Sequence, residues 1–318
     1  INDKLFNWND GSLKIHFLGN NGGSICNLVN ASQGVSNIEA YPTWKLYQFI
    51  FEKNIYENLN VAIGLYDLNS EFDTRETGSI FINPSHGVGD ELAKSGVNGP
   101  SIFPNTSFGI RLKYNFDETR GFLVAILDGV SGNPENPKGT HIIFNKNDGL
   151  LTIGEYQLSN EEYKVSFGSW LYTQKSDNFL IPNNPENNYG FYLSAEKFNM
   201  LSNENLSGFI RIGSANKSTN PVDYYFGSGL VYNNLNFINI SEIAFATALS
   251  HNSQSYTYFM KQEEIFIRDF EINLELTFSI KLAEWLFLQP DFQFIINPSF
   301  CPINKTAFVT GTRLNLQL

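Results

Sequence analysis

The chain has 318 residues and a formal net charge of −11 at pH 7, with 17% charged, 15% aromatic and 42% hydrophobic residues. This length suits two ordinary domains or one large all-β barrel, and the low charged fraction with many aromatic residues favours the barrel. The acidic balance and the lack of a Lys/Arg cluster exclude a protein that follows nucleic-acid phosphates, and no apolar run approaches the roughly 18 residues of a membrane-spanning helix.

The N-terminal residues, INDKLFNWND, have neither a basic start nor an apolar stretch. We therefore expect any signal peptide to have been removed or to lie outside this sequence. A membrane-spanning β-strand is still possible.

Alternation of apolar and polar residues predicts about fourteen β-strands. Their spans are residues 12–18, 43–52, 59–66, 106–115, 121–127, 150–158, 163–173, 188–198, 206–215, 223–232, 241–250, 269–282, 285–296 and 306–318. Short connections, such as residues 53–58, alternate with long ones, such as residues 19–42 and 128–149. Outer-membrane barrels have short turns at one rim and long loops at the other, whereas a soluble sandwich has no reason to keep this alternation.

The longest segment without a sustained period covers residues 65–104. It mixes carboxylates, Gly and Pro with isolated apolar residues such as Phe72 and Phe81. Long loops inside compact architectures are often functional. The preceding strand has the small residues Ala62 and Gly64 on its predicted inner face, which leaves room for a loop to enter. We therefore predict that residues 65–104 fold inward as a constriction loop.

The clearest strand pattern, DFEINLELTFSIKL, covers residues 269–282. Its alternation is sustained for about 14 residues, whereas a strand of a soluble sheet usually has about 5 or 6. Residues 285–296 repeat the pattern after a very short connection, which predicts a hairpin. Strands this long, with one apolar and one charged face, suit a membrane barrel.

The face opposite the apolar one carries charged and amide side chains on strand after strand. Such density in a closed core would be prohibitive, because each unpaired buried charge costs several kcal/mol, whereas a water-filled lumen removes that cost. Carboxylate and guanidinium groups beside an aromatic face suit a neutral polyol. The residues that supply this combination are Arg111, Glu155, Trp170 and Arg211. For each of them, an ordinary lumen residue paired across the barrel is the alternative interpretation.

Catalytic and metal-binding motifs are weak. His86 follows Ser85, but no G-x-S-x-G motif surrounds the pair, and no H-E-x-x-H or EF-hand spacing is present. We expect no enzyme activity and no cofactor. Cys26 and Cys301 lack C-x-x-C spacing, so one disulfide and two free thiols both stay open.

A series of segments resembles carbohydrate-selective porins of the OprB type in order and spacing over nearly the whole chain. These segments are SNIEA (36–40), LYDLNSEF (65–72), FINPSHG (81–87), SGVNGPSIFP (95–104), FGIRLKY (108–114), GFIRIGSA (208–215), VDYYFGSGLVY (222–232), LELTF (274–278), LQPDFQFIINP (288–298) and GTRL (311–314).

The resemblance implies an outer-membrane barrel of about 16 strands that passes monosaccharides such as glucose. It implies a constriction lined by Arg, Glu and aromatic side chains, with residues 65–104 packed into the lumen and Arg111 facing the narrowest part. Family members have two strands before the one that resembles residues 12–18. We therefore expect that this chain lacks their N-terminal segment or closes with fewer strands. Its last residue, Leu318, also departs from the usual Phe.

The sequence thus predicts one transmembrane antiparallel β-barrel over residues 1–318, in the outer membrane of a Gram-negative bacterium, acting as a passive sugar channel. The candidate constriction residues are Arg111, Glu155, Trp170, Arg211, Glu39, Asp67, Glu71, Glu275 and Asp291. Expected partners are monosaccharides or small oligosaccharides, outer-membrane lipid and lipopolysaccharide, and no nucleic acid; a monomer and a homotrimer both stay open. The alternative is a soluble β-rich carbohydrate-binding or adhesive module, whose apolar faces would pair inward.

Overall fold

The computed structural model describes residues 11–235 and 240–317, which form one antiparallel sheet of 14 strands in sequential order. The strands are β1 (Gly11–Asn20), β2 (Thr43–Tyr56), β3 (Leu59–Tyr66), β4 (Ser107–Asn115), β5 (Arg120–Asp128), β6 (Leu150–Ser159), β7 (Tyr163–Ser176), β8 (Glu186–Lys197), β9 (Leu206–Ala215), β10 (Val222–Asn233), β11 (Ile240–Asn252), β12 (Phe270–Ala283), β13 (Leu286–Ile296) and β14 (Ala307–Leu316). Each overlaps one predicted strand, so the predicted set is confirmed.

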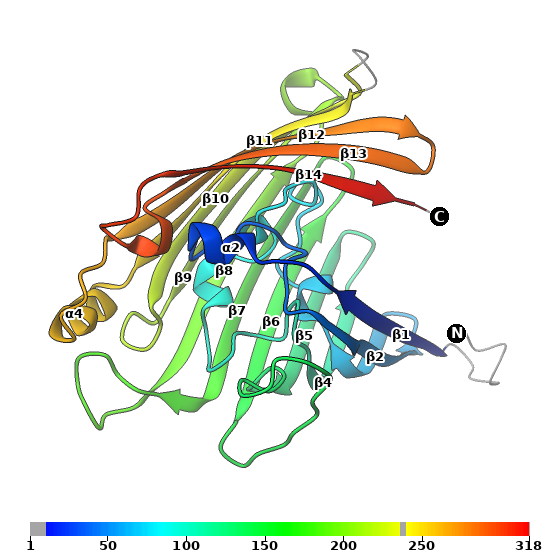
Figure 1. Cartoon of the computed structure of the whole chain (residues 1–318). Coiled ribbons are helices and arrows are strands. Elements are labelled where there is room, and N and C mark those ends of the chain that lie inside the picture. The colour runs from blue at the N-terminus through cyan, green and yellow to red at the C-terminus, as the bar shows by residue number, and fades with distance from the viewer. Residues whose placement is uncertain (1–10, 236–239, 318) are drawn as a thin grey trace.

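The sheet curves strongly, as in a barrel wall, but its ends do not meet (Figure 1). In the described part of the chain, β1 pairs only with β2 and β14 pairs only with β13. The predicted antiparallel barrel architecture is confirmed, with 14 strands described where the resemblance implies about 16.

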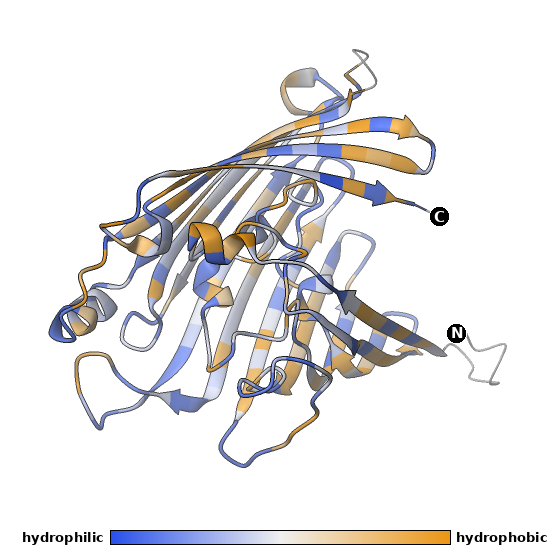
Figure 2. Cartoon of the chain, viewed as in Figure 1, coloured by the Kyte–Doolittle hydropathy of each residue, from blue (hydrophilic) through white to orange (hydrophobic). Residues whose placement is uncertain are grey.

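Alternation along each strand separates an apolar outer face from a polar inner face, as the colours along the strands show (Figure 2). On β12, the inner residues Glu271 and Glu275 are fully buried, whereas Phe270 on the outer face is 40% exposed. On β8, Phe191 is 52% exposed and its inward neighbour Tyr192 is buried. The soluble-module alternative required apolar faces that pair inward, and this sheet exposes them instead.

The connections differ at the two ends of the sheet. One end, called the turn end, has short connections, including residues 57–58, 116–119, 160–162 and 284–285. The opposite end, called the loop end, carries longer connections, including those with helices α2 (Ile25–Val29) and α4 (Gln254–Gln262). No helix in the described residues has the length and apolar character needed to cross a membrane.

Residues 67–106, called the inner loop, connect β3 to β4 and contain the short helices η1 (Leu68–Ser70), η2 (Pro84–His86) and α3 (Asp90–Ala93). Phe72 and Leu92 are fully buried in an apolar cluster with Trp170 and Tyr192 from the inner face of the sheet. The inner loop therefore packs against the concave side of the sheet. Just before it, Gly64 has a φ of 142°, and a Cβ atom there would lie 1.8 Å from the Phe49 carbonyl oxygen, so only glycine fits.

Candidate functional site

A buried group of four charged residues, called the charge cluster, joins the inner loop to β9. Its members are Asp73, Arg75 and Glu91 of the inner loop and Arg211 of β9. Arg211 Nη2 lies 2.9 Å from Asp73 Oδ2 and 2.6 Å from Glu91 Oε1, and Arg75 Nη1 lies 2.6 Å from Asp73 Oδ1. All four side chains are at most 1% exposed. Two carboxylates thus face two guanidinium groups, and this balance makes their burial tolerable.

The surroundings of Arg211 leave space for its guanidinium group. The rings of Tyr192 and Tyr225 lie 5.1 and 5.0 Å from its central carbon, within cation–π range. A Cβ atom at Gly213 would lie 2.0 Å from Glu91 Oε1, and one at Gly89 would lie 1.9 Å from Arg211 Nη1. A larger residue at either position would displace the ion pairs.

Charge balance also sets the protonation of Asp73 in the inner loop. Burial alone would raise the pKa of this carboxyl, but the positive charges of Arg211 and Arg75 outweigh burial and hold the pKa below its ordinary value. Asp73 is therefore ionised at neutral pH and keeps both guanidinium groups paired.

Strand glutamates also hold the inner loop by its backbone. The bonds run from Asp73 N to Glu155 at 2.7 Å, from Glu76 N and Thr77 N to Glu196 at 3.2 and 2.7 Å, and from Ile82 N and Asn83 N to Glu275 at 2.5 and 3.0 Å. Buried N–H groups need acceptors, and the two oxygens of a glutamate side chain can accept several such bonds. Strands β6, β8 and β12 thereby fix the path of the loop.

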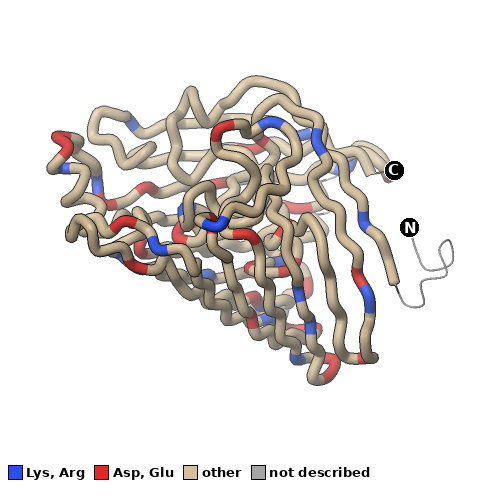
Figure 3. The backbone as a smooth tube through the Cα atoms, turned by 90° about the horizontal axis from the view of Figure 1, so that it is seen from below, with Lys and Arg blue, Asp and Glu red and all other residues tan. Residues whose placement is uncertain are grey.

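A second ionic group surrounds Arg111 of β4. Its Nε donates to Glu71 Oε2 at 2.6 Å and its Nη2 donates to Glu52 Oε1 at 3.0 Å. The Tyr66 hydroxyl donates to the same oxygen of Glu71 at 2.5 Å. The Arg111 side chain is 4% exposed, but those of Glu71 and Glu52 are 22% and 39% exposed, so these two carboxylates reach solvent. Along the backbone, Lys and Arg residues lie near Asp and Glu residues in several places (Figure 3).

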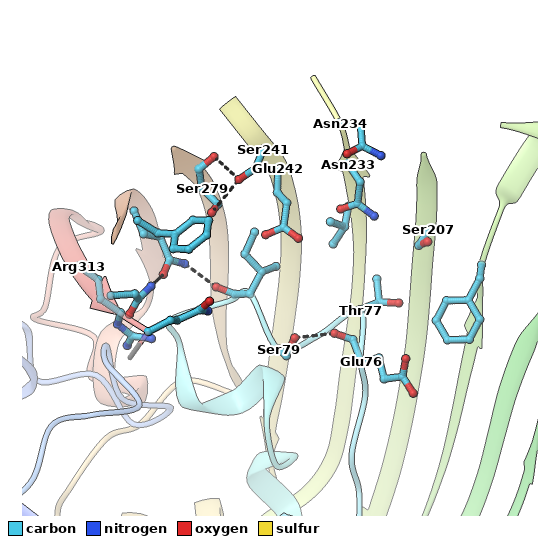
Figure 4. A pocket seen from close by; sticks show the side chains of 17 residues that line it. Glu76, Thr77, Ser79, Ser207, Asn233, Asn234, Ser241, Glu242, Ser279 and Arg313 are labelled. Atoms are coloured by element: carbon cyan, nitrogen blue, oxygen red, sulfur yellow. Dashed lines mark hydrogen bonds between the residues drawn. The ribbon is translucent and has the colours of Figure 1, made fainter. Parts of the chain in front are cut away.

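A cavity of about 760 Å³, called the turn-side cavity, opens between the inner loop and the turn ends of β9 to β14. Figure 4 places Arg313 at one side, Glu76, Thr77 and Ser207 at the other, and Glu242 between them. The lining residues are Glu76, Thr77, Ser79, Ile80, Phe198, Ser207, Val231, Asn233, Asn234, Ser241, Glu242, Ser279, Phe287, Gln289, Arg313, Asn315 and Gln317. Most of them are uncharged hydrogen-bonding residues, which suits a polar, uncharged solute.

A polar inner face, an apolar outer face and an internal loop joined to the wall are features of a porin. The sequence pattern of the carbohydrate-selective porin, OprB family, matches residues 3–318. The chain belongs to this family. Porins of this family are outer-membrane β-barrel channels, and the predictions of a porin and of an outer-membrane barrel fold are confirmed.

Solved porin structures share this fold. The high-pH structure of Pseudomonas putida OprB superposes with a TM-score of 0.85 at 19% identity, covering 99% of this chain and 84% of that one. A mutant of the Rh. blastica porin gives 0.52 at 11% identity, covering 88% and 81%. The Acinetobacter baumannii channel DcaP gives 0.51 at 9% identity, covering 96% of each chain. At these identities the likeness concerns the fold alone. No curated protein sequence matches this porin.

The remaining predicted constriction residues lie in several environments. Asp67 caps the start of η1 and accepts a bond of 2.7 Å from the Tyr47 hydroxyl. Asp291 on β13 accepts one of 2.8 Å from Gln293 Nε2. Trp170 is buried, and its indole N–H has no partner among the described residues. Contact of the predicted residues with a sugar stays a prediction.

Glu39 lies outside the inner loop, in the connection between β1 and β2. It accepts a bond of 3.1 Å from Cys26 N and another from the Ser24 hydroxyl, at the start of α2. In the same connection, Ser32 N and Gln33 N donate to Glu271 of β12, each at 2.8 Å. Glu39 thus stabilises a neighbouring loop, and Glu271 anchors that loop to the wall. Cys26 and Cys301 are both free thiols.

The sequence analysis selected none of Glu76, Asn233, Glu242 and Arg313, which line the turn-side cavity. The strand residues of the turn-side cavity lie towards the turn ends of their strands, where alternation breaks down, and Glu76 lies in the aperiodic inner loop. The pairing of β11 with β12 shifts register between Ile240 and Glu242, and such a bulge changes the direction of side chains. No sequence signal marks that shift.

His86 of η2 is the buried histidine of the inner loop. Its Nε2 lies 3.7 Å from Glu275 Oε2, and its ring packs on Phe81 at 4.8 Å. Burial, and then the positive charge of Arg75, lower the pKa of His86 to about 3. The imidazole is therefore neutral in the folded porin, whereas a released loop would take up a proton below its ordinary pKa of about 6.5.

We predict that His86 makes the folded loop less stable as the pH falls from about 6.5 towards 3, since only the released loop binds the proton there. Burial raises the pKa values of Asp90 and Glu91, which acts in the opposite sense. The effect is therefore measured as a difference: between pH 7 and pH 4, the temperature of heat-induced unfolding should fall further for the wild type than for His86→Gln. Equal shifts in the two proteins would contradict it.

Proposed function

We propose that this porin lies in the outer membrane of a Gram-negative bacterium and lets neutral monosaccharides such as glucose diffuse passively across it. The observation that supports this most is the inner loop, which ion pairs and backbone hydrogen bonds hold across the concave face. A loop fixed at many points keeps a narrow passage of constant shape. Constant shape is what selection by size and hydrogen bonding requires.

Residues 65–104 form the constriction in this proposal, and Arg111 with Glu71 and Glu52 provides the wall that a sugar touches. The two carboxylates are partly exposed and accept hydrogen bonds from sugar hydroxyls, while Arg111 fixes their positions. Glu155, Glu275 and Arg211 act indirectly, because they bind the loop itself. The passage exchanges the hydration of a sugar for these bonds without holding it tightly. No cofactor and no chemical step are needed.

The outer face fits lipid contact in the same proposal. Side chains such as Phe191, Ile212 and Phe245 are 52%, 47% and 50% exposed and lie on three different strands. An apolar band of this kind matches the hydrocarbon of a bilayer, with lipopolysaccharide as the neighbour at the loop rim. Both a monomer and a trimer are compatible with it.

Liposome swelling tests the proposed function. Liposomes that contain the porin should swell faster in isotonic glucose than in a trisaccharide or in gluconate, because the constriction admits small neutral solutes. Arg111→Ala frees Glu71 and Glu52 from their common partner, so the preference for glucose should fall several-fold. Arg120→Ala, which breaks an ion pair in an exposed turn, is the control and should swell as the wild type does. Equal rates for all three solutes would remove the sugar preference, and no swelling would remove the channel.

A further inference from the structure

The turn-side cavity contains polar groups that the ion pairs of the inner loop do not use. No described residue forms a hydrogen bond or ion pair with the carboxylate of Glu242 or with that of Glu76. Thr77 Oγ1 and Asn233 Oδ1 also have no partner among the described residues. Buried polar atoms are normally paired, so unpaired acceptors at the wall of a cavity indicate a ligand or ordered water.

The opposite wall supplies donors. Arg313 of β14 donates one Nη2 bond to Asn37 Oδ1, and its Nε and Nη1 groups have no acceptor among the described residues. The register shift in β11 places Ser241 beside Glu242 in the cavity, where the Ser241 hydroxyl bonds to Ser279 Oγ at 3.0 Å. Figure 4 shows that the guanidinium group of Arg313 and the carboxylate of Glu242 both line this cavity.

We propose that the turn-side cavity is a second binding site for a neutral monosaccharide, on the turn side of the constriction. The proposal rests on the proposed function. It names the place where a sugar that has passed the constriction is held before it leaves the pore. The cavity volume of about 760 Å³ lies within the range of about 300–1,000 Å³ for small-ligand sites.

The lining residues match the chemistry of a sugar. The Glu242 carboxylate accepts bonds from two neighbouring hydroxyls, the free nitrogens of Arg313 donate to hydroxyl or ring oxygens, and the Asn233 amide can do both. Phe287 adds an apolar surface for the C–H face of the ring. Two carboxylates and one guanidinium group give the wall a negative balance, which disfavours sugar acids.

Glucose block of the ionic current tests the site. In a planar bilayer, the current noise at rising glucose concentration gives the dissociation constant of the sugar in the pore. Glu242→Gln replaces an ionised acceptor by a neutral one and should raise this constant about tenfold, equivalent to about 1.4 kcal/mol. Asn233→Ala should raise it several-fold. In the wild type, glucuronate should bind more weakly than glucose, and Glu242→Gln should narrow that difference.

Glu284→Gln is the matched control, because it makes the same charge change in the turn between β12 and β13, where the side chain is 89% exposed. It should keep the wild-type constant. Heat-modifiable migration on a gel checks that each variant is folded, and Asn233→Ala carries the test if Glu242→Gln fails to fold. A wild type that swells liposomes in glucose, with both cavity variants within twofold of its dissociation constant, would overturn the second site and leave the proposed function intact. A wild type with neither swelling nor block would instead overturn the proposed function.

Discussion

Replacing Arg211 with alanine is expected to release the inner loop from β9 and to widen the pore. Glu91 would lose its ionic partner while its side chain is fully buried, and Asp73 would keep only Arg75. Removing one partner from a buried ion pair typically costs about 3–5 kcal/mol, because the remaining charge stays buried without compensation. Single-channel conductance should rise several-fold, and the difference between glucose and trisaccharide swelling rates should shrink.

Limited proteolysis checks the same variant independently of conductance. Trypsin cleaves after arginine. The side chain of Arg75, in the charge cluster, is only 1% exposed. The wild type should resist cleavage at Arg75, and Arg211→Ala should be cut there. Arg211→Lys keeps a positive charge but cannot pair with both carboxylates in the same geometry, so it should be intermediate. Unchanged conductance together with full protection at Arg75 would show that apolar packing alone holds the loop.

Replacing Glu275 with leucine is expected to free the middle of the inner loop while its first part stays in place. Ile82 N and Asn83 N would lose their acceptor inside the protein, and a buried donor left without a partner costs about 1–3 kcal/mol. Glu275→Gln keeps one acceptor oxygen and should have a smaller effect.

Hydrogen exchange separates this effect from general unfolding. Amides of residues 80–88 should exchange much faster in Glu275→Leu than in the wild type. Amides of residues 73–77 should keep their protection, because Glu155 and Glu196 bind that part of the loop. Faster exchange over both segments would mean that the loop opens as one unit, and protection at residues 80–88 would exclude Glu275 as an anchor.

The sequence carried much information about the wall and little about the loop. Alternation in residues 269–282 identified β12 and assigned Glu271 and Glu275 to the inner face, and both are fully buried there. It also selected Arg111, Arg211 and Glu155 as inner residues. In the structure, Glu155 and Arg211 also bind the inner loop. Only contacts between distant segments reveal this.

The sequence by itself determined the number of strands, their order and the two faces of the sheet. These features depend on a period of two within each strand, which is local and can be read residue by residue. The tertiary structure alone decided the charge cluster, the backbone anchors and the turn-side cavity. Asp73 and Arg211 are 138 residues apart in the sequence, and Ile82 and Glu275 are 193 apart. An aperiodic loop has no repeating pattern that encodes its partners, so its position depends on the few charged side chains that the curved sheet brings within reach.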